Sequence, residues 1–302
     1  MPDDHDRPAD DPPTPALPHL RWTERPALRQ PVLVTAFEGW NDAGSAATSA
    51  AQFLIDAWDA TPFCDIDPEE FFDFSATRPT VRFDDDGTRH IDWPENALHW
   101  ARLSDDLDVV VLLGTEPQLR WRTFADHVTT LAEHLGARLV VSLGALLAEV
   151  PHTRPVSVYG AAYDAAVADE LALTPSHYEG PTGIVGVLHD AYRTRGLTSA
   201  SLWAAVPSYV PSAPSPKAAL ALVARVTHLL GTTVDADELS EAAAEYETQL
   251  DEAVGEDDES KAYVARLEQA WDESDLEVEG AAEPRGTELM AEIESFLRDQ
   301  RD

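Results

Sequence analysis

The chain has 302 residues, of which 44% are hydrophobic and 25% charged, and this is typical of one or two folded domains rather than of a disordered protein. Its net charge of −35 repels phosphate backbones and anionic lipid headgroups, which argues against nucleic acid or a membrane as a partner. Cys64 is the single cysteine, the apolar runs are far shorter than the roughly 20 residues that span a bilayer, and no secretory signal opens the chain, so we expect a cytoplasmic protein without disulfides.

Residues 1–30 contain seven of the 22 prolines together with scattered Asp and Arg. Such a segment buries too little apolar surface to offset the entropy of ordering, so we expect a disordered leader. The α/β core is expected at residues 31–233. It begins with an apolar run at residues 32–37, typical of a strand covered on both faces, and an Ala-rich helix follows over residues 43–58.

Short β-like pieces fill residues 62–103, and an Asp-Gly pair between two of them predicts a hairpin over residues 81–91. Two alternatives are open for this region: an insertion, or further strands of the main sheet. A buried strand at residues 108–113, a helix at 119–135 and a buried strand at 138–143 come next. Because their connections are short, they predict a right-handed parallel crossover.

The second half of the core continues the alternation of strands and helices. A strand is expected at residues 156–159, and a helix over residues 184–195 is predicted to end at a glycine. Another strand follows at residues 201–206. Ser215 before a proline is typical of a helix start, and Gly231 marks the end of that helix.

Residues 234–302 differ in character, because from Asp235 onward the chain has 24 Asp and Glu against five Lys and Arg. Apolar residues nevertheless recur at helical spacing in three stretches. These are Leu239, Ala243, Tyr246, Leu250 and Val254, then Tyr263, Leu267 and Trp271, and finally Leu289, Ile293 and Phe296. We therefore expect an acidic helical extension whose apolar faces pack against this core or against a neighbouring molecule.

The loop after the first strand carries the most informative group of polar and small residues. Glycines let a ligand approach the backbone, and unpaired amides at a helix start can bind an anion. The sequence matches neither GxGxxG nor a phosphate-binding loop. The structural alternative, which we favour, is that the carboxylate caps the helix and the amide stabilises the turn. The candidate ligand-binding residues are Glu38, Gly39, Trp40, Asn41, Asp42 and Gly44.

Two further loops, expected after strand ends, contain Gly114, Glu116 and Gly144. In a parallel sheet such loops meet at the carboxyl edge, where ligands usually bind. Glu116 beside the first loop is a candidate general base or hard-metal ligand, although two separated carboxylates make no specific metal motif. The alternative for Glu116 is a turn residue ahead of a helix. Gly183, which opens the 184–195 helix, completes the candidates for a ligand cleft.

The remaining reactive residues favour structural roles. The ten histidines are scattered, without HExxH or a Cys/His cluster, so no metal site is expected. His177 beside Ser176, and Ser142 elsewhere, lack the GxSxG elbow of a serine hydrolase. Cys64 is expected to be a small buried filler. Tyr209, in a Pro-bracketed segment, is expected to contact a ligand or another subunit, or to close the sheet edge.

Four segments lie in order between about residues 31 and 231. They are VLVTAFEGWNDAG, VVVLLGTEP, LVVSLGALLAEVPHTRP and the stretch that begins GPTGIVGVLHDAYRTRG and ends VARVTHLLG. Together they resemble the bacterial, actinobacterial-type branch of the proteasome assembly chaperone family. The resemblance implies a three-layer α/β/α sandwich with a mixed, mostly parallel sheet, as in nucleoside phosphorylases and related hydrolases, plus an acidic helical C-terminal extension. It also implies homo-oligomers such as trimers, with proteasome subunits as partners.

In eukaryotic and archaeal relatives, the resemblance implies scaffolding of proteasome α subunits, partly through a C-terminal hydrophobic-Tyr-any tail. This chain ends in Asp299-Gln300-Arg301-Asp302, so docking by that route is not expected.

Our leading hypothesis is a non-catalytic, oligomeric protein without cofactors that acts through protein–protein contacts. The alternative is a small-molecule-binding protein, or a hydrolase- or phosphorylase-like enzyme, that uses the cleft around Asn41, Asp42 and Glu116. A third possibility is that the acidic helices alone bind a basic partner.

Overall fold

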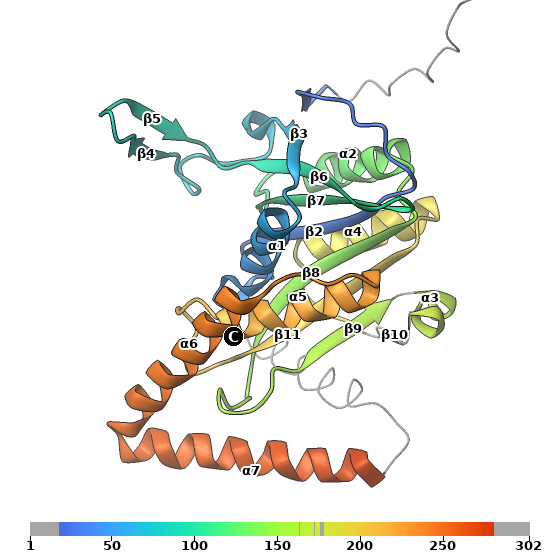
Figure 1. The fold of residues 1–302 in the computed structure, drawn as a ribbon. Helices are drawn as coiled ribbons and strands as arrows, with labels where there is room; N and C mark the ends of the chain where they lie inside the picture. Colours follow the sequence, from blue (N-terminus) through green and yellow to red (C-terminus); the bar gives the residue numbers. More distant parts are fainter. Residues whose placement is uncertain (1–17, 163, 172, 176–177, 281–302) are drawn as a thin grey trace, which may run out of the picture.

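The computed structural model describes residues 18–162, 164–171, 173–175 and 178–280. Its centre is a mixed nine-stranded sheet with helices on both faces (Figure 1). The inner strands β7, β2, β8 and β11 are mutually parallel, and antiparallel strands flank them. This confirms the predicted fold class. From one edge to the other the strands are β1 (Leu20–Trp22), β3 (Thr61–Ile66), β6 (Asn96–Ser104), β7 (Leu107–Thr115), β2 (Val32–Glu38), β8 (Leu139–Ala148), β11 (Ser199–Pro207), β9 (Val158–Ala162) and β10 (Thr174–Pro175).

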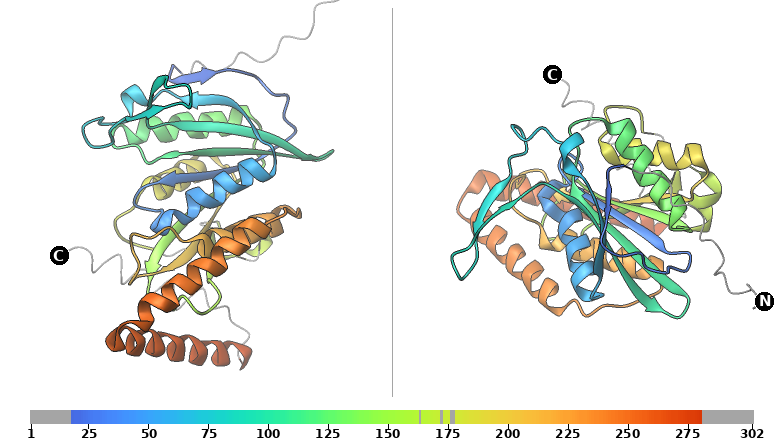
Figure 2. Two further views of the ribbon diagram at one scale, coloured as in Figure 1. Left: turned by 60° about the vertical axis from the view of Figure 1, so that its left-hand side comes forward. Right: turned by 90° about the horizontal axis from the view of Figure 1, so that it is seen from above.

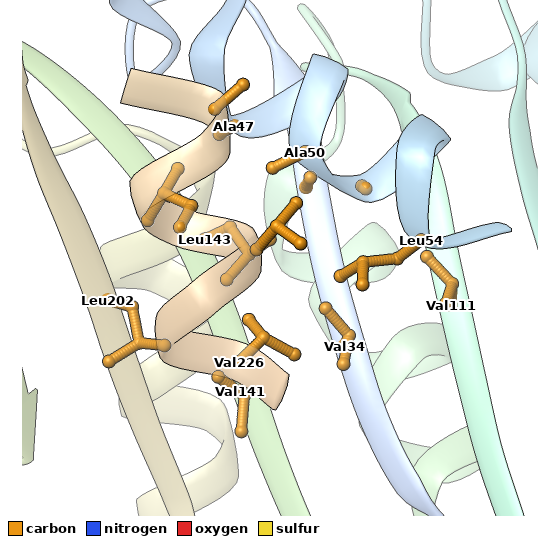
Figure 3. Close-up of a cluster of buried hydrophobic side chains, with 14 of the residues drawn as sticks. Val34, Ala47, Ala50, Leu54, Val111, Val141, Leu143, Leu202 and Val226 are labelled. Carbon is orange, nitrogen blue, oxygen red and sulfur yellow. The ribbon is translucent and has the colours of Figure 1, made fainter. Parts of the chain in front are cut away.

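Two pairs of helices cover the two faces of the sheet (Figure 2). Helices α1 (Ala46–Ala57) and α5 (Pro216–Leu230) pack on one face, and α2 (Trp121–His134) and α4 (Ile184–Arg195) on the other. Each face carries one cluster of buried hydrophobic side chains, the first beneath α1 and α5 and the second beneath α2 and α4. Because successive strand residues point to opposite faces, β2 supplies Val34 to the first cluster and Leu33 to the second. Figure 3 shows the first cluster, in which small Ala side chains of α1 bring the helix close to the sheet.

The predicted helix ends are confirmed in α4 and α5. Ser215 accepts a hydrogen bond from the amide of Ala218, with proline at the first helical position. Gly196 and Gly231 follow the last residues of α4 and α5 with φ of 72° and 65°, in the left-handed region that glycine adopts without strain. The shorter helices are η1 (Ala43–Ser45), η2 (Pro68–Glu70) and α3 (Ala165–Glu170).

Residues 20–22, which were expected to belong to a disordered leader, form the edge strand β1 instead. Leu20 and Trp22 pack against the second cluster, while the Arg21 side chain between them pairs with Asp65 of β3. Three residues of alternating burial are enough to extend an existing sheet edge, although they are too few to outweigh a proline-rich composition in the sequence. Residues 1–17 lie outside the described part of the chain.

For the region between α1 and β7, the sequence leaves two alternatives open, an insertion or further strands of the main sheet, and the structure contains both. Strands β3 and β6 extend the main sheet, whereas β4 (Thr80–Phe83) and β5 (Arg89–Asp92) form a separate two-stranded sheet, which confirms the predicted hairpin. Gly87 has a φ of 82° in its turn, and the amide of Asp84 donates to the carbonyl of Thr88. The hairpin projects from the body of the molecule (Figure 1).

The predicted acidic extension forms helices α6 (Asp237–Gly255) and α7 (Asp258–Gly280). Helix α6 packs on α5, where Ala243 and Tyr246 are buried, and α7 packs on α6. Part of the apolar stripe therefore covers the chain's own core. The third expected stripe, Leu289 to Phe296, lies outside the described residues. No helix in the described part of the chain is both long and apolar enough to cross a membrane.

Candidate functional site

The loop after β2 meets the loop after β7 at the carboxyl edge of the sheet. The amide of Glu116 donates to the carbonyl of Glu38 over 2.8 Å, and the Glu116 carboxylate lies 3.4 Å from the amide of Trp40. Gly39 has a φ of 143°, and a Cβ there would lie 2.9 Å from the Glu116 Cβ. This close approach requires glycine at position 39, so the contact between the two loops accounts for that residue.

Asp42 holds the start of helix α1. Its Oδ1 accepts hydrogen bonds from the amides of Ala47, over 2.7 Å, and Thr48, over 3.2 Å, and its Oδ2 accepts one from the Thr48 hydroxyl. Burial raises the pKa of the Asp42 carboxyl, nearby Glu38 raises it further, and the hydrogen bonds from Thr48 and Ala47 oppose this. The geometry is that of a helix cap.

Replacing Asp42 by Ala is expected to lower the free energy of unfolding by about 2–3 kcal/mol, because three donors lose their acceptor. Asp42→Asn keeps an oxygen at the Oδ1 position and should cost less than about 1 kcal/mol. Urea denaturation of the three proteins measures both values. Equal losses for Ala and Asn would contradict the capping role.

Stability should also depend on pH through Asp42. The folded-state pKa lies above the ordinary value of 3.8, so the folded chain holds this proton more tightly than the unfolded chain does. The extra stability from protonated Asp42 is present below pH 3.8 and is lost as the pH rises through the raised folded pKa. The stability of the native protein relative to Asp42→Asn should therefore increase on acidification through that interval, and urea titrations at several pH values measure it.

Glu116 joins three separate segments of the chain. Besides its contacts with the β2 loop, its Oε1 accepts a hydrogen bond of 2.7 Å from the amide of Ile184, the first residue of α4. A carboxylate at a helix start also interacts favourably with the helix dipole. Gly183 lies against it, since a Cβ there would be 2.7 Å from Glu116 Oε1 and in hard contact with the Asn41 side-chain oxygen. The side chain of Glu116 thus fixes α4 to the sheet edge.

Glu116→Ala should lower the free energy of unfolding by about 1–3 kcal/mol, because the Ile184 amide is part-buried and loses its acceptor. Glu116→Gln retains an acceptor and should lose less than half as much. The two variants are compared by thermal and urea unfolding. A full loss in the Gln variant would show that the charge, and not the acceptor, is what matters.

Close packing explains the other predicted glycines, two of them within the sheet and one before α1. The expected loop at residues 143–145 is wrong, because β8 runs on to Ala148 in parallel pairing with β11. A Cβ at Gly144 would lie 2.5 Å from the Trp203 ring of that neighbouring strand. Gly114 lies within β7 opposite Asn96, and Gly44, with a φ of 57°, packs against Ser215 before α5.

Two residues of the loop, Trp40 and Asn41, have features that these contacts do not explain. Trp40 is 44% exposed, although it is large and apolar. The Asn41 carbonyl accepts a hydrogen bond of 2.8 Å from the Ala145 amide, while its buried side-chain oxygen has no hydrogen-bond partner among the described residues. The structure therefore brings the predicted loops together, and the use of this place by a ligand stays a prediction.

The remaining candidates of the sequence have these positions. Ser142 is buried in β8 and accepts a hydrogen bond of 3.0 Å from the Thr35 hydroxyl. Cys64 is buried in β3, as expected, and burial raises the pKa of its thiol to about 12. Ser176 and His177 lie outside the described residues.

A second polar cluster, which the sequence does not predict, joins the core to the acidic helices. The amide of His152 donates to the Tyr209 hydroxyl over 2.9 Å, and the same hydroxyl lies 2.6 Å from His152 Nδ1. His152 Nε2 lies 3.1 Å from the Asp251 carboxylate of α6. The Tyr209 ring stacks edge-on against Tyr263 of α7, with centroids 5.8 Å apart. Burial raises the pKa of Tyr209 to about 12, so its hydroxyl stays protonated.

Two basic side chains extend this cluster. Arg154 binds Asp272 of α7 through two hydrogen bonds of 2.8 Å, and it lies 3.3 Å from Glu268. Lys217, one of only two lysines in the chain, pairs with Glu247 of α6 and donates to the carbonyl of His152. In the sequence, only the scarcity of lysine and the Pro-bracketed Tyr209 draw attention to residues of this cluster. Neither feature indicates which helix supplies the partner.

Comparisons with known proteins agree with this fold. The model of the PAC2 family matches residues 36–254. A PAC2 family protein from Streptomyces avermitilis is similar at 44% identity, over 78% of this chain and 99% of that one, with a TM-score of 0.72. A proteasome-assembly chaperone homologue from Mycobacterium tuberculosis is similar at 45% identity, over 77% of this chain and 99% of that one, with a TM-score of 0.69.

An archaeal proteasome activator from Pyrococcus furiosus shares the fold, at 19% identity over 78% of this chain and 97% of that one, with a TM-score of 0.66. No curated protein matches the chain. The family model covers well over half of the sequence, and the Streptomyces and Mycobacterium structures are similar along nearly their whole length. The chain belongs to the PAC2 family.

Proposed function

We propose that the protein is a non-catalytic, oligomeric proteasome-assembly chaperone of the cytoplasm, which holds proteasome subunits through protein–protein contacts. The observation that carries this proposal is the 45% identity with the Mycobacterium tuberculosis proteasome-assembly chaperone homologue, of which 99% is covered. A stable complex of this kind needs an interface of at least about 1,000 Å².

The geometry of the carboxyl edge supports a non-catalytic role. A general base must lie within hydrogen-bond distance of a substrate proton. Asp42 and Glu116 are the carboxylates that were candidates for this task, and both accept hydrogen bonds from backbone amides at helix starts. Their arrangement favours a structural part in holding α1 and α4 to the sheet.

The experiment mixes the purified full-length protein with unassembled proteasome α and β subunits from the same organism. We expect co-elution with the α subunits in gel filtration, and faster appearance of the complete particle on native gels. Because a chain of charge −35 binds basic surfaces unspecifically, the mixture is repeated at 0.5 M salt, where such contacts are screened within about 4 Å. Unchanged assembly without co-elution would contradict the proposal.

The ligand-binding alternative has one supporting observation, the unpartnered side-chain oxygen of Asn41 beside exposed Trp40. A panel of small molecules is screened by thermal shift, with Asn41→Ala as the variant that should lose any response. Under the chaperone proposal, we expect no compound to raise the melting temperature of the native protein more than that of Asn41→Ala.

A further inference from the structure

The projecting β4–β5 hairpin has one apolar face that is largely exposed in the described part of the chain, although the Phe74 ring packs edge-on against Trp93, with centroids 4.9 Å apart. The cross-strand pairs are Val81 with Ile91, and Phe83 with Arg89. Val81, Phe83 and Ile91 are exposed by between 43% and 64%, and Trp93, which follows β5, is exposed by 49%. We call Val81, Phe83, Ile91 and Trp93 the hairpin face.

The opposite side of the hairpin is polar, and its Arg82 and His90 side chains lie against aspartates of the hairpin. Arg82 pairs with Asp84 and with Asp92, at 3.2 Å in the second case, and His90 lies 2.6 Å from Asp84. An alternation of apolar and polar sides is typical of a strand pair with one side packed on a core. An isolated two-stranded hairpin is only marginally stable in water, so its apolar side indicates a covering surface.

The other exposed large apolar side chains among the described residues are Trp40 and Leu119, at 44% and 45%. We call these two residues the edge patch, since they lie in the loops after β2 and β7. The edge patch and the base of the hairpin are joined along one edge. Glu116 contacts the amide of Trp40, and Gln118 donates to the hydroxyl of Thr77 over 2.7 Å.

Charge distinguishes between the possible occupants of the hairpin face. Two copies of a chain with a charge of −35 repel each other, so a contact between copies must use a nearly neutral part of the surface. Residues 78–93 contain three arginines and four aspartates, close to neutrality. Exposed Arg89 lies on the apolar side of the hairpin, and exposed Glu38 stands two residues from Trp40.

We propose that the hairpin face of one copy covers the edge patch of a second copy, with Arg89 of one copy meeting Glu38 of the other. Glu38 lies close enough to buried Asp42 to repel its charge. The positive charge of Arg89 from the second copy would reduce this repulsion. Because the two surfaces differ, the contact repeats in any closed ring of copies, in which each copy supplies one hairpin face and one edge patch. The inference rests on the oligomeric part of the proposed function and names its interface.

Cysteine cross-linking between two populations of the full-length protein tests the contact. One population carries Phe83→Cys and the other, with a different tag, carries Leu119→Cys. The native Cys64 is buried and its thiol has a pKa of about 12, so it does not compete. We expect a mixed disulfide under mild oxidation. Thr80→Cys, on the polar side of the hairpin, is the matched control and should give at least tenfold less product. Equal yields from both positions would overturn the proposal.

Exchange of charges gives a second and independent test. Arg89→Glu and Glu38→Arg should each weaken self-association, measured by light scattering over a concentration series, by roughly tenfold, because each places like charges together. A protein with both substitutions should regain association to within about threefold of the native value. Arg138→Glu makes the same change of charge at an exposed residue just before β8, at the amino ends of the parallel strands, and should have no such effect. Failure of the double variant to recover would overturn the proposal.

The outcomes separate this inference from the proposed function. If Arg89→Glu leaves self-association intact but abolishes capture of proteasome α subunits, the hairpin face binds the client and the proposal is wrong. If the cross-link and the charge exchange succeed while no proteasome subunit is captured, the interface stands and the chaperone function fails.

Discussion

Gly114→Ala should be among the most damaging single-methyl changes in the protein, with an expected loss of about 3 kcal/mol or more in the free energy of unfolding. A Cβ at this position would lie 2.6 Å from the Asn96 Cα and in hard contact with the Glu95 carbonyl and the Asn96 side chain. These are mostly backbone atoms at the start of β6, so rotation of a side chain cannot relieve the overlap. Urea unfolding measures the loss.

Gly255→Ala is the matched control for Gly114. It lies at the end of α6, where no atom comes within 4 Å of an added Cβ, so alanine should leave stability unchanged or raise it by up to about 1 kcal/mol. If Gly114→Ala were as stable as the control, close packing would not explain the glycine, and its candidacy as a ligand-contacting residue would gain weight.

Local rules predict the helix ends and the buried strands of this protein well. Ser215-Pro216 and the glycines after α4 and α5 act through their own backbone and immediate neighbours, so their effect is legible in the sequence. The parallel crossover from β7 through α2 to β8 follows from short connections as well. In the sheet, β2 lies between β7 and β8. This position depends on long-range pairing, which no local sequence pattern encodes.

The same distinction separates the two polar clusters. The loops with Asp42 and Glu116 follow parallel strands, and strand polarity alone brings them to one edge. Their roles as caps depend on where α1 and α4 begin. The cap is predictable for Asp42, which precedes its own helix. For Glu116 the sequence predicts only a turn ahead of the next helix, because its partner Ile184 is 68 residues away. The contacts of His152 with Tyr209 and Asp251 span 57 and 99 residues, so only the folded chain reveals them.

His152→Ala should release the acidic helices from the core. The His152 side chain is almost fully buried between the Tyr209 hydroxyl and the Asp251 carboxylate, and its loss leaves both without that partner. We expect a decrease of about 2–3 kcal/mol in the free energy of local opening, because a buried polar network loses its central member. Hydrogen exchange should report it as faster exchange in α6 and α7, with amides of the central strands β2 and β8 little changed.

Two variants make this prediction specific. Tyr209→Phe removes only the hydroxyl and keeps the edge-on contact with Tyr263, so it should show about 1 kcal/mol of the same local effect. His228→Ala removes an exposed histidine from the outer side of α5 and should leave exchange in α6 and α7 unchanged. Helix α6 packs on α5, and both α6 and α7 contact the loops after β8 and β11. A uniform increase in exchange over the whole chain would instead mean that His152 stabilises the core and that the helices are not an independently opening unit.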